Sequence, residues 1–82
     1  MNPAVDSARA KIQEGLSCVE LELTATHDDP NGAHVSIRAV SARFEGLSHV
    51  KRQQLVYGAI WDEMRGAIHA VDSMVCKAPG EA

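Results

Sequence analysis

Aromatic residues and cysteines are scarce in this chain of 82 residues, and long apolar runs are missing. With aromatic residues at 4% and apolar residues at 45%, we expect a core built mainly from Val, Ile, Leu, Ala and Met. No apolar run approaches the roughly 20 residues that a membrane-spanning helix needs, so a transmembrane segment is excluded. The two cysteines, Cys18 and Cys76, form no CxxC pair, which argues against a disulfide scaffold and favours a reducing intracellular compartment.

An excess of positive charge is also missing, because the formal net charge is −3. A protein held to nucleic acid by bulk electrostatics normally needs a basic face, so this balance counts against such a partner. Residues 1–4 carry neither the basic nor the apolar stretch of a signal peptide. We therefore expect the protein to work in the cytoplasm, or in a mitochondrion or plastid after a targeting segment has been removed.

The first half of the chain predicts a helix followed by a β-hairpin. Asp6 or Ser7 can cap the helix, and Gly15 weakens its end around residues 15–17. Apolar side chains at helical spacing predict one buried stripe: Val5, Ala8, Ile12 and Leu16. Strands are predicted over residues 18–25 and 34–41, with turn chemistry at 26–32, where Asn31-Gly32 suits positive φ. Alternation in the first strand predicts these inward-facing residues: Val19, Leu21, Leu23 and Ala25.

The second half predicts a long helix and a third strand. Phe44, the only phenylalanine, is expected to fill the core under a turn at Gly46. Ser48 caps a helix that runs to about Arg65. Its predicted buried stripe comprises Val50, Leu55, Val56, Ala59, Ile60 and Met64. After Gly66, residues 68–77 form a strand with a mixed polarity pattern, and residues 1–5 and 78–82 are expected to be flexible ends.

The predicted order is therefore α-β-β-α-β in a single α+β domain spanning residues 1–82. A hairpin followed by a helical crossover predicts a three-stranded mixed sheet with the helices packed on one face. If the crossover returns beside the second strand, that pair of strands is parallel.

The residues between His34 and Pro79 resemble the BolA-like family, and the similarity covers nearly all of residues 19–79. Within this family, their sequence most resembles that of the organellar BolA-like proteins of plants and algae. The matching positions are Ser41-Ala42-Arg43-Phe44, Gly46, Arg52, Val56-Tyr57, His69-Ala70 and Lys77-Ala78-Pro79. The resemblance implies a fold similar to the type II KH domain. It also implies a non-catalytic adaptor that binds a monothiol glutaredoxin and shares a bridging 2Fe–2S cluster with it, as a monomer without cofactor when alone.

Histidines are the candidate metal ligands. His69 opens the third strand, and an imidazole there suits iron or zinc, although a half-buried, backbone-bonded histidine is the ordinary alternative. The resemblance favours the ligand, because the BolA family uses this histidine for its cluster. His34 and His27 compete for the second position. We prefer His34, which the following strand holds, because Asp28 and Asp29 favour the protonated, non-ligating form of His27.

Basic residues near the second helix are candidate contacts. We expect Lys51 and Arg52, with Lys77 and Pro79, to contact the glutaredoxin. The alternative function is a KH-like, nucleic-acid-binding transcriptional regulator that uses Arg43, Lys51 and Arg52, but the Gly-x-x-Gly loop of KH proteins is missing. No catalytic motif or phosphate-binding loop is recognisable, so we expect no enzyme activity. Cys18 and Cys76 are expected to be small buried hydrophobes, and His49 a surface residue.

Overall fold

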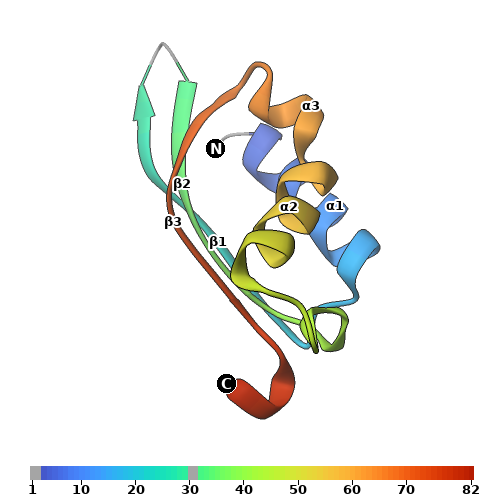
Figure 1. Cartoon of the computed structure of the whole chain (residues 1–82). Coiled ribbons are helices and arrows are strands. Elements are labelled where there is room, and N and C mark those ends of the chain that lie inside the picture. Colours follow the sequence, from blue (N-terminus) through green and yellow to red (C-terminus); the bar gives the residue numbers. More distant parts are fainter. Residues whose placement is uncertain (1–2, 30–31) are drawn as a thin grey trace.

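A three-stranded mixed sheet forms one layer of the protein and helices form the other. The structure, a computed structural model, describes residues 3–29 and 32–82. Its elements are α1 (Pro3–Leu16), β1 (Glu20–Asp29), β2 (Gly32–Val40), η1 (Ala42–Phe44), α2 (His49–Ala59), α3 (Trp61–Met64), β3 (Ile68–Lys77) and η2 (Pro79–Glu81). The strand order is β1-β2-β3, with β1 antiparallel and β3 parallel to β2. The predicted fold class, element order and parallel pair are confirmed, and all three α-helices lie on one face of the sheet (Figure 1).

The first helix buries the stripe that its spacing predicts. Val5, Ala8, Ile12 and Leu16 are all at most 7% exposed. The helix has already begun at Pro3, whose fixed φ suits a first turn, so the predicted caps Asp6 and Ser7 lie inside the helix instead. The expectation that residues 3–5 are a flexible end is therefore wrong, and residues 1–2 lie outside the described part of the chain.

The long second helix is interrupted where the sequence predicts continuity. Ser48 caps α2 as expected, because its side chain accepts a hydrogen bond from the Lys51 amide. At Ile60 the backbone leaves helical geometry (φ −116°, ψ 23°), and α3 resumes with Trp61. Val56 and Ile60 are fully buried, but Val50 and Leu55 are 62% and 40% exposed, so the predicted stripe is too wide. A break of one residue leaves the apolar spacing unchanged, which is why the pattern does not reveal it.

The hairpin strands are longer than predicted. β1 runs to Asp29 and β2 begins at Gly32, so most of the predicted turn belongs to strands. The predicted Asn31-Gly32 turn includes residues 30–31, which lie outside the described residues. The start of β1 also differs. Ser17 has φ 49°, which turns the chain after α1, and Val19 is 68% exposed instead of facing inward as predicted. Of the predicted inward residues, Leu23 is buried, Leu21 half-buried and Ala25 exposed.

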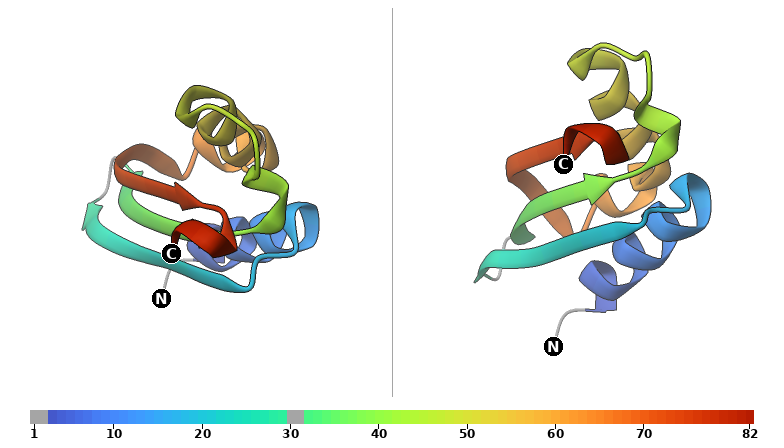
Figure 2. Two further views of the ribbon diagram at one scale, coloured as in Figure 1. Left: turned by 60° about the horizontal axis from the view of Figure 1, so that its bottom comes forward. Right: turned by 90° about the horizontal axis from the view of Figure 1, so that it is seen from below.

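Two ends of the sheet can be distinguished along its length. At one end lie the β1–β2 hairpin and the start of β3, and at the other end lie η1, the start of α2 and the C-terminal turn η2 (Figures 1 and 2). Phe44 is fully buried and Gly46 has φ 74°, as the sequence predicts. None of the helices in the described ranges has the length and hydropathy to cross a bilayer.

Candidate metal-binding site

The structure brings His34 and His69 side by side. Their ring centroids are 5.5 Å apart, and the ring planes are inclined by 33°. His34 lies near the start of β2 and His69 is the second residue of β3. Because these two strands are parallel neighbours, their first residues meet at the same end of the sheet. The His69 residue is exposed and the His34 side chain is 29% exposed, so solvent reaches this pair.

Three strand irregularities surround this pair. In the pairing of β2 with β3, the register shifts so that His69 and Asp72 are the extra residues without a partner position on β2. In the pairing of β1 with β2, Thr26 is the extra residue between Ala25 and His27. A bulge kinks the strand and turns a side chain out of regular alternation. The bulges therefore supply neighbours that an unbroken ladder would not place around His34.

Asp72 makes a polar contact with the ring of His34. Its Oδ1 lies 3.0 Å from Nδ1 of His34, and its Oδ2 accepts a hydrogen bond of 2.7 Å from the Thr26 hydroxyl. The three residues come from three different strands. The sequence analysis did not single out Thr26 or Asp72. The two bulges in β3 explain why residues 68–77 show a mixed polarity pattern instead of regular alternation.

The spacing of the two imidazoles fits a shared metal ion. With metal–nitrogen bonds of about 2.0–2.1 Å and tetrahedral angles, two imidazoles on one ion place their ring centroids roughly 5 Å apart. The observed 5.5 Å between the ring centroids lies close to this value. Among the described residues no group of three or more His, Cys, Asp or Glu side chains could hold a metal ion. The pair thus offers two ligands of a four-ligand set.

The choice between His34 and His27 stays a prediction. The backbone of His27 lies opposite His34 in the register of β1 and β2. Its side chain lies outside the described part of the structure. What the structure adds is the direct proximity of the His34 ring to His69.

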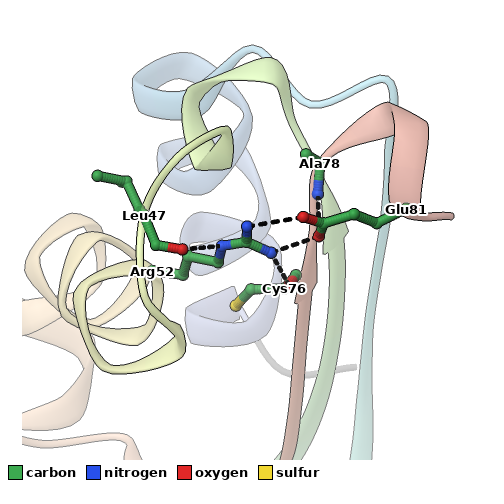
Figure 3. A network of polar contacts seen from close by, with 5 residues as sticks. All are labelled: Leu47, Arg52, Cys76, Ala78 and Glu81. Atoms are coloured by element: carbon green, nitrogen blue, oxygen red, sulfur yellow. Dashed lines mark hydrogen bonds and ion pairs between the residues drawn. The ribbon is translucent and has the colours of Figure 1, made fainter.

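Arg52 is buried, so the prediction that it is a contact for the glutaredoxin or for nucleic acid is wrong. The residue is 5% exposed, and its guanidinium donates to the carbonyl oxygens of Leu47 (2.9 Å) and Cys76 (3.2 Å) (Figure 3). It also binds the Glu81 carboxylate through two parallel hydrogen bonds, one of 2.9 Å from Nη2. The planar fork of arginine suits this arrangement, which lysine cannot reproduce. Arg52 therefore joins α2, β3 and the C-terminal turn instead of facing a partner.

The C-terminal residues are held by the same contacts. Ala78 is 4% exposed, and Glu81 also accepts a hydrogen bond from the Ala78 amide at 3.1 Å. The expectation that residues 78–82 fray is therefore wrong for residues 78–81, which form an ordered turn.

The Arg52–Glu81 pair predicts a specific response to acid. The Arg52 guanidinium lowers the pKa of Glu81 to about 2. A carboxylate whose pKa is depressed in the folded state stabilises it above its ordinary pKa, 4.5, and loses that contribution as the pH falls towards 2. We expect Glu81→Gln to be less stable than the wild type at neutral pH, and the difference to shrink between about pH 4.5 and 2. Urea unfolding at a series of pH values measures this, and a difference independent of pH would contradict it.

The other predicted partner contacts lie far from the histidines. Lys51, Arg43 and Pro79 are exposed and Lys77 is half-buried. Lys77 comes eight residues after His69 along β3, which corresponds to roughly 25 Å in a strand. The protein measures 38 × 20 × 18 Å, so the two groups occupy opposite ends of its longest dimension.

Both cysteines are buried, as expected, at 9% and 5% exposure for Cys18 and Cys76. Neither forms a disulfide. Burial is the main cause that raises the pKa of each thiol. A buried thiol of raised pKa is a poor source of thiolate, so neither cysteine is a good metal ligand in this fold.

The fold and the exposed histidine pair define a small α+β domain with a polar site at one end of a mixed sheet. Residues 12–81 match the family model described as BolA-like protein, and the chain belongs to this family. It is 38% identical over 76 residues to human BolA-like protein 1, a match that covers 87% of this chain but only 56% of the human protein. The BolA1 structure from Arabidopsis thaliana has a TM-score of 0.88 and 34% identity, and the match covers 100% of this chain and 99% of that one.

A BolA domain also occurs within a longer relative. The chain is 36% identical over 86 residues to SufE-like protein 1, chloroplastic/mitochondrial, of Arabidopsis thaliana. That match covers 89% of this chain and 23% of the relative. Relatives of this domain thus include organellar proteins of more than one architecture.

Proposed function

We propose that this protein is a non-catalytic adaptor of iron–sulfur metabolism that binds a monothiol glutaredoxin. In the complex, His69 and His34 would ligate one iron of a bridging 2Fe–2S cluster. The observation that carries this proposal is the pair of neighbouring, solvent-accessible imidazoles at the shared end of β2 and β3. Membership of the BolA-like family supports it, because the resemblance drawn from the sequence assigns a cluster ligand to His69.

The donor set explains why a partner is needed. Two imidazoles replace two thiolates on one iron of a 2Fe–2S cluster in other proteins, where they raise the reduction potential. The remaining ligands would be sulfur atoms from the glutaredoxin side, since both cysteines of this chain are buried with raised thiol pKa. The chain's own contribution is to hold two neutral ring nitrogens at a fixed separation on rigid strands.

The size of a normal interface limits the footprint of the partner. About 800 Å² per partner corresponds to a patch roughly 30 Å across. Such a patch, centred on the histidines, extends roughly 15 Å from them, so it covers the hairpin end of the sheet and does not reach Lys77, which lies roughly 25 Å from His69 along β3. We propose that Lys51, Lys77 and Pro79 contact the glutaredoxin only through a footprint elongated along β3, and Arg52 is no longer among the proposed contacts.

Nucleic-acid binding gains no support from the geometry. Of the three residues assigned to it, Arg52 is committed to Glu81 and to two backbone carbonyls. Arg38, another positive charge on the sheet, is paired with Glu20 at 2.6 Å. What remains of the three is Lys51 in the first turn of α2 and Arg43 in η1, in a chain of net charge −3.

The proposal is tested by mixing the chain with a cluster-loaded monothiol glutaredoxin and recording visible circular dichroism. We expect a new spectrum that saturates at one chain per cluster, because imidazole ligands change the asymmetry and energy of the iron–sulfur transitions. Trp61, the only tryptophan, is 60% exposed on α3, which leads into β3, so its fluorescence gives an independent measure of association. If the glutaredoxin binds and the cluster spectrum does not change, the proposal that the two proteins share the cluster is refuted.

A further inference from the structure

Asp72 contacts the ring of His34 on the side of Nδ1. Its carboxylate oxygen Oδ1 lies 3.0 Å from that nitrogen, within hydrogen-bond distance. An ionised carboxylate has no proton to give, so the proton in this bond belongs to the imidazole. When the ring is neutral, it therefore carries its proton on Nδ1 and its lone pair on Nε2.

Thr26 holds Asp72 in this position. Its hydroxyl donates to Oδ2 of the same carboxylate at 2.7 Å. Thr26 and Asp72 are the extra residues of two different bulges, one on each side of β2, which carries His34. The carboxylate is thus anchored from β1 and reaches the ring from β3.

The other bulge residue of β3, besides Asp72, is His69 itself. In regular alternation along β3, His69 and Asp72, three positions apart, would point to opposite faces of the sheet. The two register shifts change this alternation, and both side chains contact or neighbour the ring of His34. The same irregularity therefore brings the proposed ligand and the carboxylate to one ring.

We propose that Asp72, held by Thr26, is a positioning residue that fixes the tautomer and orientation of His34, so that Nε2 is the nitrogen offered to a metal. This inference rests on the proposed function for the identity of the metal, but its effect on the ring exists without any metal. Metal-binding histidines commonly donate their other ring N–H to a carboxylate, and removal of that partner lowers metal affinity about 10–100-fold. Asp72 does not touch the metal in this arrangement.

The tautomer can be observed directly in the protein without metal. Long-range proton–nitrogen correlation spectra in mildly alkaline solution report which nitrogen of each imidazole is protonated. We expect the wild-type His34 to carry its proton on Nδ1, and Asp72→Ala to shift it towards the Nε2–H form that an isolated imidazole prefers. His49, exposed on α2, supplies the reference for an unconstrained ring in the same spectra.

Metal affinity gives the second readout. Each variant is titrated into cluster-loaded glutaredoxin, and the visible spectrum reports how much cluster-bridged complex has formed. We expect Asp72→Ala to weaken formation of this complex about 10–100-fold, and Thr26→Val to weaken it less. Glu22→Ala is the matched control. It removes one exposed carboxylate beside Ser36 and Ser73 on the sheet and makes the same change in net charge. We expect this variant to behave as the wild type.

The outcomes separate the two proposals. A wild-type His34 protonated on Nε2, or a tautomer that Asp72→Ala leaves unchanged, overturns the inference whether or not a cluster binds. If Asp72→Ala shifts the tautomer but the wild type takes up no cluster, the control of the ring by Asp72 is supported and the proposed function fails. Equal cluster sharing by Asp72→Ala and Glu22→Ala overturns the metal-directed role of Asp72.

Discussion

Replacing Arg52 with alanine is expected to lower the midpoint of thermal unfolding by on the order of 10 °C, a large effect for a domain of this size. The substitution leaves the carbonyl oxygens of Leu47 and Cys76 without this donor and removes the two hydrogen bonds to Glu81 (Figure 3). Removing Arg52 is costly mainly because the buried carbonyl oxygen of Cys76 loses its donor, whereas the Glu81 side chain, 47% exposed, can return to water. Scanning calorimetry at neutral pH measures the shift.

Three further variants show whether the geometry or only the charge of Arg52 matters. Arg52→Lys keeps the charge but lacks the planar fork, so we expect it to recover only a small part of the loss. Glu81→Ala is expected to release η2 while leaving the rest of the fold intact. Lys51→Ala, next to Arg52 but exposed, is the control and should unfold like the wild type. If Arg52→Ala were as stable as Lys51→Ala, the buried network would have no structural role.

Features that depend on one residue type in one local conformation were predictable from the sequence. Gly46 lies at positive φ, Ser48 caps α2, and Phe44 is fully buried beneath this turn. Each follows from local chemistry: a glycine free of Cβ, a short hydroxyl side chain, and a large apolar ring in a small core. The stripe of α1 follows from its spacing in the same way. The fold class could therefore be predicted with correct strand pairing.

Features that depend on contacts between distant residues were not predictable in this way. Arg52 looks like an exposed charge at a helix start, and only the return of the chain at Glu81, 29 residues later, buries it. The bulges at Thr26, His69 and Asp72 depend on how three strands fit together, and a single strand does not specify its register against the others. The family resemblance could single out His69 as a candidate ligand, but the sequence could not reveal that the Asp72 carboxylate contacts the neighbouring ring of His34.

We infer that one end of the sheet stabilises the fold and the other binds the cluster. The end with η2 is closed by the Arg52 network and contributes stability, while the end with the hairpin presents imidazoles to solvent. Substitutions at the first end should therefore change unfolding more than cluster sharing, and substitutions at the second end should do the reverse. The separation of roughly 25 Å along β3 makes the two sets of variants energetically independent.

Replacing His69 with alanine is expected to abolish the cluster-dependent change in visible circular dichroism while leaving the fold intact. The side chain is exposed at the start of β3, so its removal creates no cavity. As a proposed direct ligand, it should matter more than Asp72, whose removal costs only the affinity that an outer contact supplies. His34→Ala should likewise lose the cluster spectrum. Far-ultraviolet spectra and thermal unfolding of both variants should match those of the wild type.

The matched control for this prediction is His49→Ala, which removes another exposed imidazole, from the start of α2. It should retain the cluster spectrum, because α2 begins at the opposite end of the sheet from the His34–His69 pair (Figure 1). If His69→Ala kept the spectrum while His27→Ala lost it, His27 would be a ligand and His69 would not. If His69→Ala, His34→Ala and His27→Ala all kept the spectrum, imidazole ligation by this chain would be refuted, and the proximity of His34 to His69 would have only a structural role.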